Sequence, residues 1–120
     1  MANTFSEWLD SILKEFDSDE IIAFNFNLYE NSEDGIYDVQ LIGSTDYDPD
    51  DDDWACNEAF SSGEDIFSFA ADDWEVALEE CVSMVKSYLS SGSYRSKLLA
   101  AKAIAAGFVD GDLELIHTGA

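Results

Sequence analysis

The 120-residue chain has very little positive charge. It contains five Lys and Arg residues and one His against 27 Asp and Glu residues, which gives a formal net charge of −22 at pH 7. The phosphates of nucleic acids and the surfaces of anionic membranes repel such a chain. We therefore expect neither nucleic acid nor membrane as a partner, and the surplus of carboxylates favours a basic protein partner.

Cysteine is also scarce. Two residues, Cys56 and Cys81, are too few for the disulfide framework of a small secreted domain or for a zinc site. Their spacing leaves open whether they pair. Met1 to Asp10 lacks the basic and apolar regions of a secretory signal, and no window is long enough for a transmembrane helix. We expect a cytoplasmic protein that is a monomer or a small homo-oligomer.

Apolar residues are plentiful by comparison. Hydrophobic residues make up 47% of the chain, which is enough for one core and argues against disorder despite the charge. The length fits one domain, residues 1–120. The acidity is uneven. Residues 1–80 hold 24 acidic residues and one basic residue, whereas residues 81–120 hold three acidic and four basic residues.

Hydrophobic periodicity predicts two main helices. The first spans about 5–17, has apolar residues at helical spacing, and begins at a Thr4 and Glu7 capping box. The second begins at Asp72, with Glu75 three residues later. Its predicted apolar stripe is Trp74, Leu78, Cys81, Val82, Val85 and Leu89. A short helical stretch is expected from Tyr94 to Ala101.

Alternation of period two predicts the strands. A hairpin is expected with strands at about 21–30 and 36–44, and shorter strands at 65–70 and 54–59. Asp-Gly at 110–111 favours a second hairpin, 102–109 and 112–117, over a helix continued from Leu98 to Ala106. The order predicts an α+β fold: an antiparallel sheet of hairpins with the two main helices packed on one face.

In the acidic segment, Asp46 to Asp53, six of the eight residues are Asp, and the segment holds the only proline of the chain. Clustered carboxylates suit calcium, but the EF-hand pattern fails. From Asp46, the position that needs glycine holds Asp51, and the position that needs Glu holds Asn57. No metal site and no cofactor is therefore predicted.

The same segment is predicted to be a contact surface for a basic partner. Arg and Lys pair well with clustered carboxylates, and Tyr and Trp are enriched among residues that dominate binding energy. The predicted partner-binding residues are Asp46, Tyr47, Asp48, Asp50, Asp51, Asp52, Asp53 and Trp54. The alternative is that Trp54 belongs to the core and the carboxylates are a solvated loop.

Catalysis has little support in the sequence. His117 is the single histidine, and neither cysteine has a His partner nearby in the chain. Neighbouring acidic residues raise a thiol pKa and reduce its reactivity. There is no nucleophile-elbow, phosphate-loop or zinc motif. We expect a protein that is not an enzyme.

The size, the charge and the α+β organisation resemble those of acidic immunity proteins from bacterial polymorphic-toxin and contact-dependent inhibition systems. The stretch from Ala103 to Ile116 is also similar to uncharacterised bacterial proteins. The resemblance implies an inhibitor that covers or distorts the active site of a basic toxin, often a nuclease, with carboxylates in place of substrate phosphates. The resemblance does not assign a role to any individual residue.

Two other functions stay open. In one, the chain is a structural or adaptor module whose acidity only gives solubility. In the other, it is a weak calcium-binding domain. Neutralising Asp50 to Asp53 would leave binding unchanged in the first, and calcium but not magnesium would stabilise the second.

Overall fold

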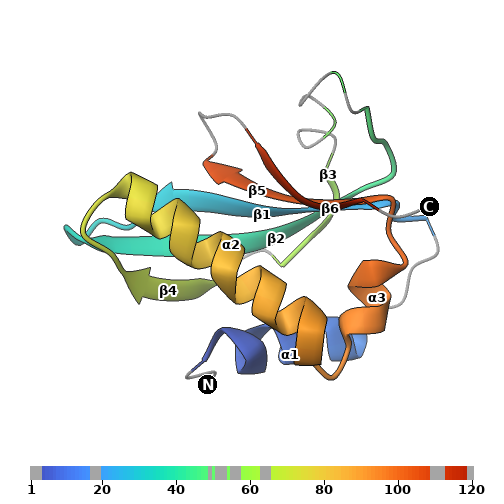
Figure 1. The fold of residues 1–120 in the computed structure, drawn as a ribbon, viewed down its shortest axis with the longest axis horizontal. Coiled ribbons are helices and arrows are strands. Elements are labelled where there is room, and N and C mark those ends of the chain that lie inside the picture. Colours follow the sequence, from blue (N-terminus) through green and yellow to red (C-terminus); the bar gives the residue numbers. More distant parts are fainter. Residues whose placement is uncertain are drawn as a thin grey trace.

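The structure has two layers, a sheet and a pair of helices on one of its faces (Figure 1). The computed structural model describes residues 4–16, 20–48, 50, 54, 58–62, 66–108 and 113–118, with only the backbone of Glu58. In chain order the elements are α1 (Phe5–Glu15), β1 (Ala23–Glu30), β2 (Ile36–Ser44), β3 (Glu58–Ser61), β4 (Phe67–Ala70), α2 (Trp74–Ser91), α3 (Arg95–Leu99), β5 (Ala103–Phe108) and β6 (Glu114–Thr118). The predicted α+β fold is confirmed.

The described strands form one six-stranded sheet in the order β3-β2-β1-β5-β6, and β4 also pairs with β2. Both predicted hairpins are present, β1 with β2 and β5 with β6, so the helical alternative for 98–106 is wrong. The sheet is mostly antiparallel, but β1 and β5 run parallel, from Ala23 beside Ala103 to Leu28 beside Phe108. The sequence predicted an antiparallel sheet; α2 and α3 provide the long crossover that a parallel pair needs.

The short strands on the outer edge of β2 differ in part from prediction. The strand expected at 65–70 is β4, but the one expected at 54–59 is β3, which spans Glu58–Ser61. Trp54 is not in a strand. Its ring is used for packing instead, because it covers the face of the sheet opposite the helices.

Helix α1 forms because its apolar residues recur at helical spacing and its first turn is capped. The side chain of Thr4 accepts a hydrogen bond from the Glu7 amide at 3.2 Å, and its hydroxyl donates to the Glu7 carboxylate at 3.1 Å. The capping-box residues are therefore those predicted, although the carboxylate meets the hydroxyl of Thr4.

Helix α2 begins one residue later than predicted. Asp73 is its N-cap and accepts from the Val76 amide at 3.0 Å, whereas Asp72 precedes the cap. The predicted stripe is also wrong at its start, because Trp74 is 54% exposed, while Ala77, Cys81, Val85 and Tyr88 are buried. Trp74 lies on the correct side of the helix, but it lies beside Phe108, the last residue of β5, where the sheet ends.

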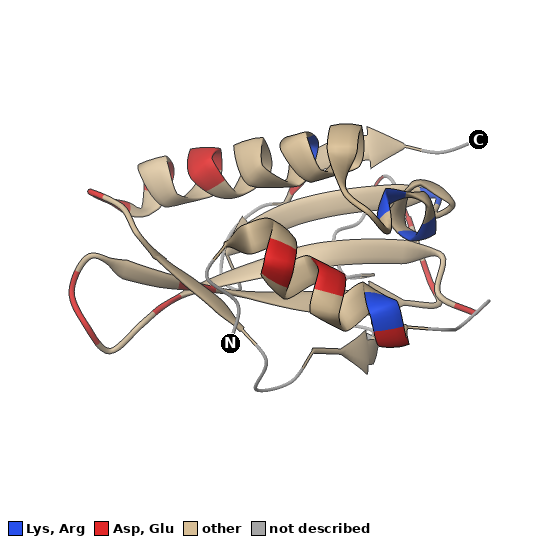
Figure 2. Ribbon diagram, turned by 90° about the horizontal axis from the view of Figure 1, so that it is seen from below, with Lys and Arg blue, Asp and Glu red and all other residues tan. Residues whose placement is uncertain are grey.

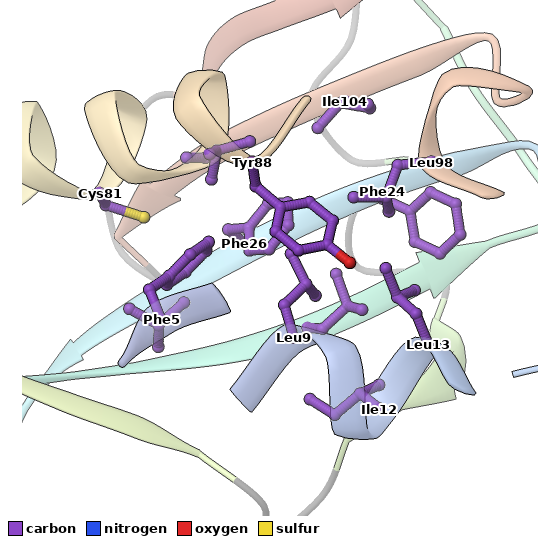
Figure 3. Close-up of a cluster of buried hydrophobic side chains, with 14 of the residues drawn as sticks. Phe5, Leu9, Ile12, Leu13, Phe24, Phe26, Cys81, Tyr88, Leu98 and Ile104 are labelled. Atoms are coloured by element: carbon purple, nitrogen blue, oxygen red, sulfur yellow. The ribbon is translucent and has the colours of Figure 1, made fainter. Parts of the chain in front are cut away.

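The core lies between the two helices and the sheet, with Tyr88 at its centre (Figure 3). Tyr88 reaches from α2 toward α1, where its hydroxyl donates to the Asp10 carboxylate at 2.6 Å. The same oxygen accepts from the Tyr94 amide at 3.1 Å, just before α3. One side chain therefore joins all three helices. Gly92 makes room for it, since a Cβ there would lie 2.5 Å from the Tyr88 ring.

No helix within the described residues is long and apolar enough to cross a membrane. The Cα radius of gyration is 13.2 Å, about the value expected for one compact domain of this length.

Candidate functional site

The described part of the acidic segment is a surface of carboxylates. Asp46, Asp48 and Asp50 are exposed. Local hydrogen bonds shape the backbone here: the Tyr47 amide donates to Asp46 at 3.1 Å, and the Asp50 amide donates to Asp48 at 2.9 Å. These short Asx contacts leave further acceptor capacity on each carboxylate. Asp51, Asp52 and Asp53 lie outside the described residues.

The two aromatic residues predicted for this surface are placed differently. Trp54 is 5% exposed, and the half-buried Tyr47 meets it edge to face with ring centroids 5.4 Å apart. Both pack on a small cluster with Ala23, Ala103 and Ala105, on the face of the sheet opposite the helices. Trp54 therefore offers a partner almost no surface, and the two rings fix the acidic segment to the sheet.

A second acidic surface lies at the other end of β2. It is formed by the β1–β2 turn and the start of α2. These two segments lie side by side, because the Ala71 amide, just before α2, donates to Gly35 O in the turn at 2.9 Å. Figure 2 shows acidic positions in that turn and just before α2 at the same end of the molecule. The carboxylates here are all exposed: Glu30, Glu33, Asp34, Asp72, Asp73 and Glu75.

The electrostatics of Tyr37 support this arrangement. Burial raises the pKa of Tyr37, and the charges of Glu30 and Asp73 raise it further. Glu30 comes from β1 and Asp73 from the cap of α2, so two distant segments act on one side chain. Glu30 and Asp73 therefore lie in one region of the surface, near Tyr37.

An exposed aromatic side chain stands in that region. Trp74 meets Phe108 edge to face with ring centroids 6.2 Å apart, and Phe108 in turn meets Tyr37 at 5.9 Å. Trp8 and Trp54 are 1% and 5% exposed, so Trp74 is the exposed tryptophan of the chain. We call Trp74, Phe108 and the six carboxylates of this end the Trp74 surface.

Sequence reasoning missed the Trp74 surface because the spacing of Trp74 fits the apolar stripe of α2. The signal that could have found it is local. Trp74 stands between Asp73 and Glu75 in the first turn of a helix, where an apolar ring has acidic neighbours on both sides. Whether Trp74 is buried depends on where the sheet ends, and that is set by how the strands pair.

The basic residues gather at the far end of the molecule from the Trp74 surface (Figure 2). Lys97 uses its ammonium group inside the fold: Nζ donates to Leu13 O and Phe16 O at 2.5 and 2.7 Å. It thus satisfies carbonyls at the C-terminal end of α1, where a positive charge is favoured by the helix dipole. Arg95 donates to Gly92 O at 2.9 Å. Two of the chain's five cations are therefore partnered by backbone carbonyls.

Two buried polar side chains lie on the sheet face opposite the helices. Asp38 is 4% exposed and accepts from Asn31 at 3.1 Å and Ser68 at 2.5 Å. Asn25 is 3% exposed, and no described residue donates to its Oδ1. Asp38 also contributes, after burial, to raising the pKa of Tyr29.

Cys81 and His117 lie on different elements of the described chain, α2 and β6. Cys81 is a free thiol in the core, where its sulfur points into the apolar cluster (Figure 3), and burial raises its pKa to about 12. Such a thiol is not a nucleophile at neutral pH. His117 lies on β6 opposite Ile104. Among the described residues, no cluster of His, Cys, Asp or Glu could hold a metal ion. Cys56 lies outside them.

Two cavities open among the described residues, and one of them lies beside carboxylates of the Trp74 surface. One, of about 190 Å³, lies between α1 and β3 and is lined by Ile12, Glu15, Phe16, Phe60 and serines 11, 61 and 62. The other, of about 120 Å³, lies in the β1–β2 turn between Glu30 and Tyr37. Both are smaller than the usual pocket for a small-molecule ligand.

Comparison with known proteins gave no family assignment: no family model, no curated protein and no solved structure matches the chain.

Proposed function

We propose that this chain is a non-catalytic binding protein that inhibits a basic protein partner, in the manner of an immunity protein that neutralises a toxin. The acidic segment contacts the partner through Asp46, Asp48 and Asp50, together with Asp51, Asp52 and Asp53. The partner's Lys and Arg side chains pair with these carboxylates. A nuclease fits this description, because its active site is built to receive phosphates.

The observation that carries the proposal is the exposed and uncompensated negative charge of a folded chain with a net charge of −22. Like charges at this density oppose the compact state. A basic partner relieves that repulsion when it binds, and the field steers it to the surface before contact. The packing of Tyr47 and Trp54 on the sheet supports the same function, since it holds Tyr47 in place between the exposed Asp46 and Asp48.

Two findings favour binding over catalysis. The thiol of Cys81 is buried and has a raised pKa, and the described residues offer no metal cluster. The exposed carboxylates of the acidic segment are suited to recognising charge.

The proposal is tested with the chain as bait in a lysate of its own host, at 50 and 300 mM NaCl. We expect one basic protein to be retained in a stoichiometric complex, and its own enzymatic activity to be lost at one equivalent of the chain. Replacing Asp46, Asp48 and Asp50 with Asn is expected to weaken that complex at least tenfold, because three charge-assisted contacts are lost. The matched control replaces three exposed carboxylates of α1 and α2, Glu7, Glu79 and Glu80, with Gln.

A complex that forms without loss of the partner's activity would refute inhibition. Retention of many basic proteins, all released by 300 mM NaCl, would refute a specific partner and favour acidity that serves solubility.

A further inference from the structure

We propose that the Trp74 surface is a second binding site, and that its ligand is an arginine side chain of a basic protein segment. The proposal shares with the proposed function only the idea that the partner is basic. It places the anchor at the opposite end of β2 from the acidic segment. A nine-residue strand separates the two ends, which corresponds to about 27 Å.

The first argument is the exposure of Trp74. A tryptophan normally buries most of its large apolar area, and this one is 54% exposed although the other two are almost fully buried. Its ring is supported from one side by Phe108, at 6.2 Å and 87° between the planes. Among the described residues, this contact leaves about half of the Trp74 side chain exposed, and the exposed part can receive a ligand.

The second argument is the charge around that ring. Asp72, Asp73 and Glu75 surround it in sequence, and Glu30 and Asp73 both act on Tyr37, which shares Phe108 with Trp74. No Lys or Arg occurs in residues 15–85 or 103–120, so the β1–β2 turn, the first turn of α2 and the end of β5 carry neither. The ligand that complements an exposed indole with acidic neighbours on both sides in the sequence is a cation with a flat face.

Arginine meets both requirements. Its guanidinium group stacks on an indole ring and donates to carboxylates in the plane of the group at the same time. Lysine carries the same charge, but its ammonium is compact and strongly hydrated, and it cannot stack. The Trp74 surface is therefore expected to distinguish Arg from Lys through its indole ring.

The test uses acetylated and amidated hexa-arginine and hexa-lysine peptides with the full chain in 150 mM NaCl. Tryptophan fluorescence and its quenching by acrylamide report on Trp74, because Trp8 and Trp54 are buried. We expect hexa-arginine to protect Trp74 from acrylamide and to bind about three- to tenfold more tightly than hexa-lysine, the factor that a cation–π contact gives.

Three variants locate the site. Trp74→Ala is expected to abolish the preference for arginine while it keeps the weaker binding that charge alone provides. Replacing Glu33 and Glu75 with Gln and Asp34 with Asn is expected to weaken hexa-arginine binding about tenfold. Asp73 is left intact, because it caps α2. The matched control, with Asp46, Asp48 and Asp50 replaced by Asn, is expected to keep both the preference and the protection.

Equal affinity for the two peptides, no protection of Trp74, or a preference that survives Trp74→Ala would each overturn the proposal. So would a loss of hexa-arginine binding in the control at the acidic segment alone. That last outcome would leave the proposed function standing, whereas the function fails separately if no basic partner is inhibited.

Discussion

At the scale of single residues, Tyr88 shows how one polar atom can organise a core. Its ring is almost fully buried, and its hydroxyl is the shared partner of the Asp10 carboxylate and the Tyr94 amide. Burial, and then the hydrogen bond to Asp10, raise the pKa of Tyr88, so the hydroxyl stays protonated and keeps donating. The position of α1 relative to α2 and α3 depends on this atom.

Replacing Tyr88 with Phe is expected to lower the free energy of unfolding by about 1–3 kcal/mol, because Asp10 and the Tyr94 amide lose their partner while the ring still fills its space. Urea unfolding measures the change. Asp10→Asn is the matched control, since an amide oxygen still accepts the hydrogen bond, and it should cost clearly less. Equal losses in both variants would mean that the charge of Asp10, and not the Tyr88 hydroxyl, is what matters.

Because the Cys81 thiol is buried, we expect the protein to lose stability at alkaline pH. Burial raises its pKa from 9.0 to about 12. Between these values the native state keeps a proton that the unfolded chain has lost, so the free energy of unfolding falls as the pH rises above about 9. Below pH 9 both states are protonated and the contribution is constant.

The measurement is urea unfolding at pH 7.5, 9 and 10 in a Cys56→Ser background, where Cys81 is the single thiol. Adding Cys81→Ala is expected to make the dependence on pH shallower above pH 9, by up to about 1.4 kcal/mol per pH unit for one proton. Identical slopes with and without Cys81 would contradict a buried, protonated thiol.

At the scale of secondary structure, the ends of the helices are held by specific contacts. Lys97 of α3 closes the C-terminal end of α1 by donating to Leu13 O and Phe16 O. Replacing it with Met keeps the aliphatic stem but removes this donor from Phe16 O, while Leu13 O keeps the Phe16 amide at 3.2 Å. We expect a loss of about 1–3 kcal/mol of unfolding free energy.

The control for Lys97→Met is Lys102→Met, which changes the net charge equally at an exposed side chain. We expect the control to stay within about 0.5 kcal/mol of the parent chain. If both variants lose the same stability, the loss comes from the added net charge and the closing contact contributes nothing.

The N-cap of α2 gives a second prediction at this scale, because sequence and structure choose different residues. Asp73→Ala is expected to cost about 1 kcal/mol, since the Val76 amide loses its acceptor. Asp72→Ala removes the same charge one residue earlier and should cost less than about 0.5 kcal/mol. Thermal unfolding of the two variants, scanned under identical conditions, decides between the caps. A greater loss for Asp72→Ala would restore the cap predicted from the sequence.

The elements themselves were largely predictable, because their causes are local. Apolar spacing and a capping box identify α1, and alternation with turn residues identifies both hairpins. The parallel pairing of β1 with β5 was not predictable, since it joins segments about 80 residues apart and depends on the path of α2 and α3. A segment's own pattern does not specify its non-sequential neighbour.

At the scale of the whole molecule, the same limit applies to the candidate surfaces. The carboxylates of the acidic segment were predictable from composition, and Asp46, Asp48 and Asp50 are exposed. The roles of the aromatic residues were not, because burial depends on the complete sheet. Trp54 is covered by packing on the second face of the sheet, and Trp74 is exposed because it lies beside the last residue of β5.

The charge of the whole molecule also explains why two acidic surfaces can coexist with a folded core. The apolar cluster is built from both helices and from the central strands, and it contains none of the described carboxylates. Of the described acidic residues, Asp38 is the buried one, and its carboxylate accepts hydrogen bonds from the side chains of Asn31 and Ser68. Folding therefore leaves the negative charge of the described carboxylates, Asp38 apart, at the surface.

The most direct test of the central claim is the association rate constant of the chain with its purified basic partner, measured by stopped flow from 20 to 500 mM NaCl. Electrostatic steering predicts a rate near 10⁸ M⁻¹s⁻¹ at low salt that falls by about tenfold or more, while the dissociation rate changes little. A rate near 10⁵–10⁶ M⁻¹s⁻¹ that does not depend on salt would contradict the claim that the acidic surface recognises the partner.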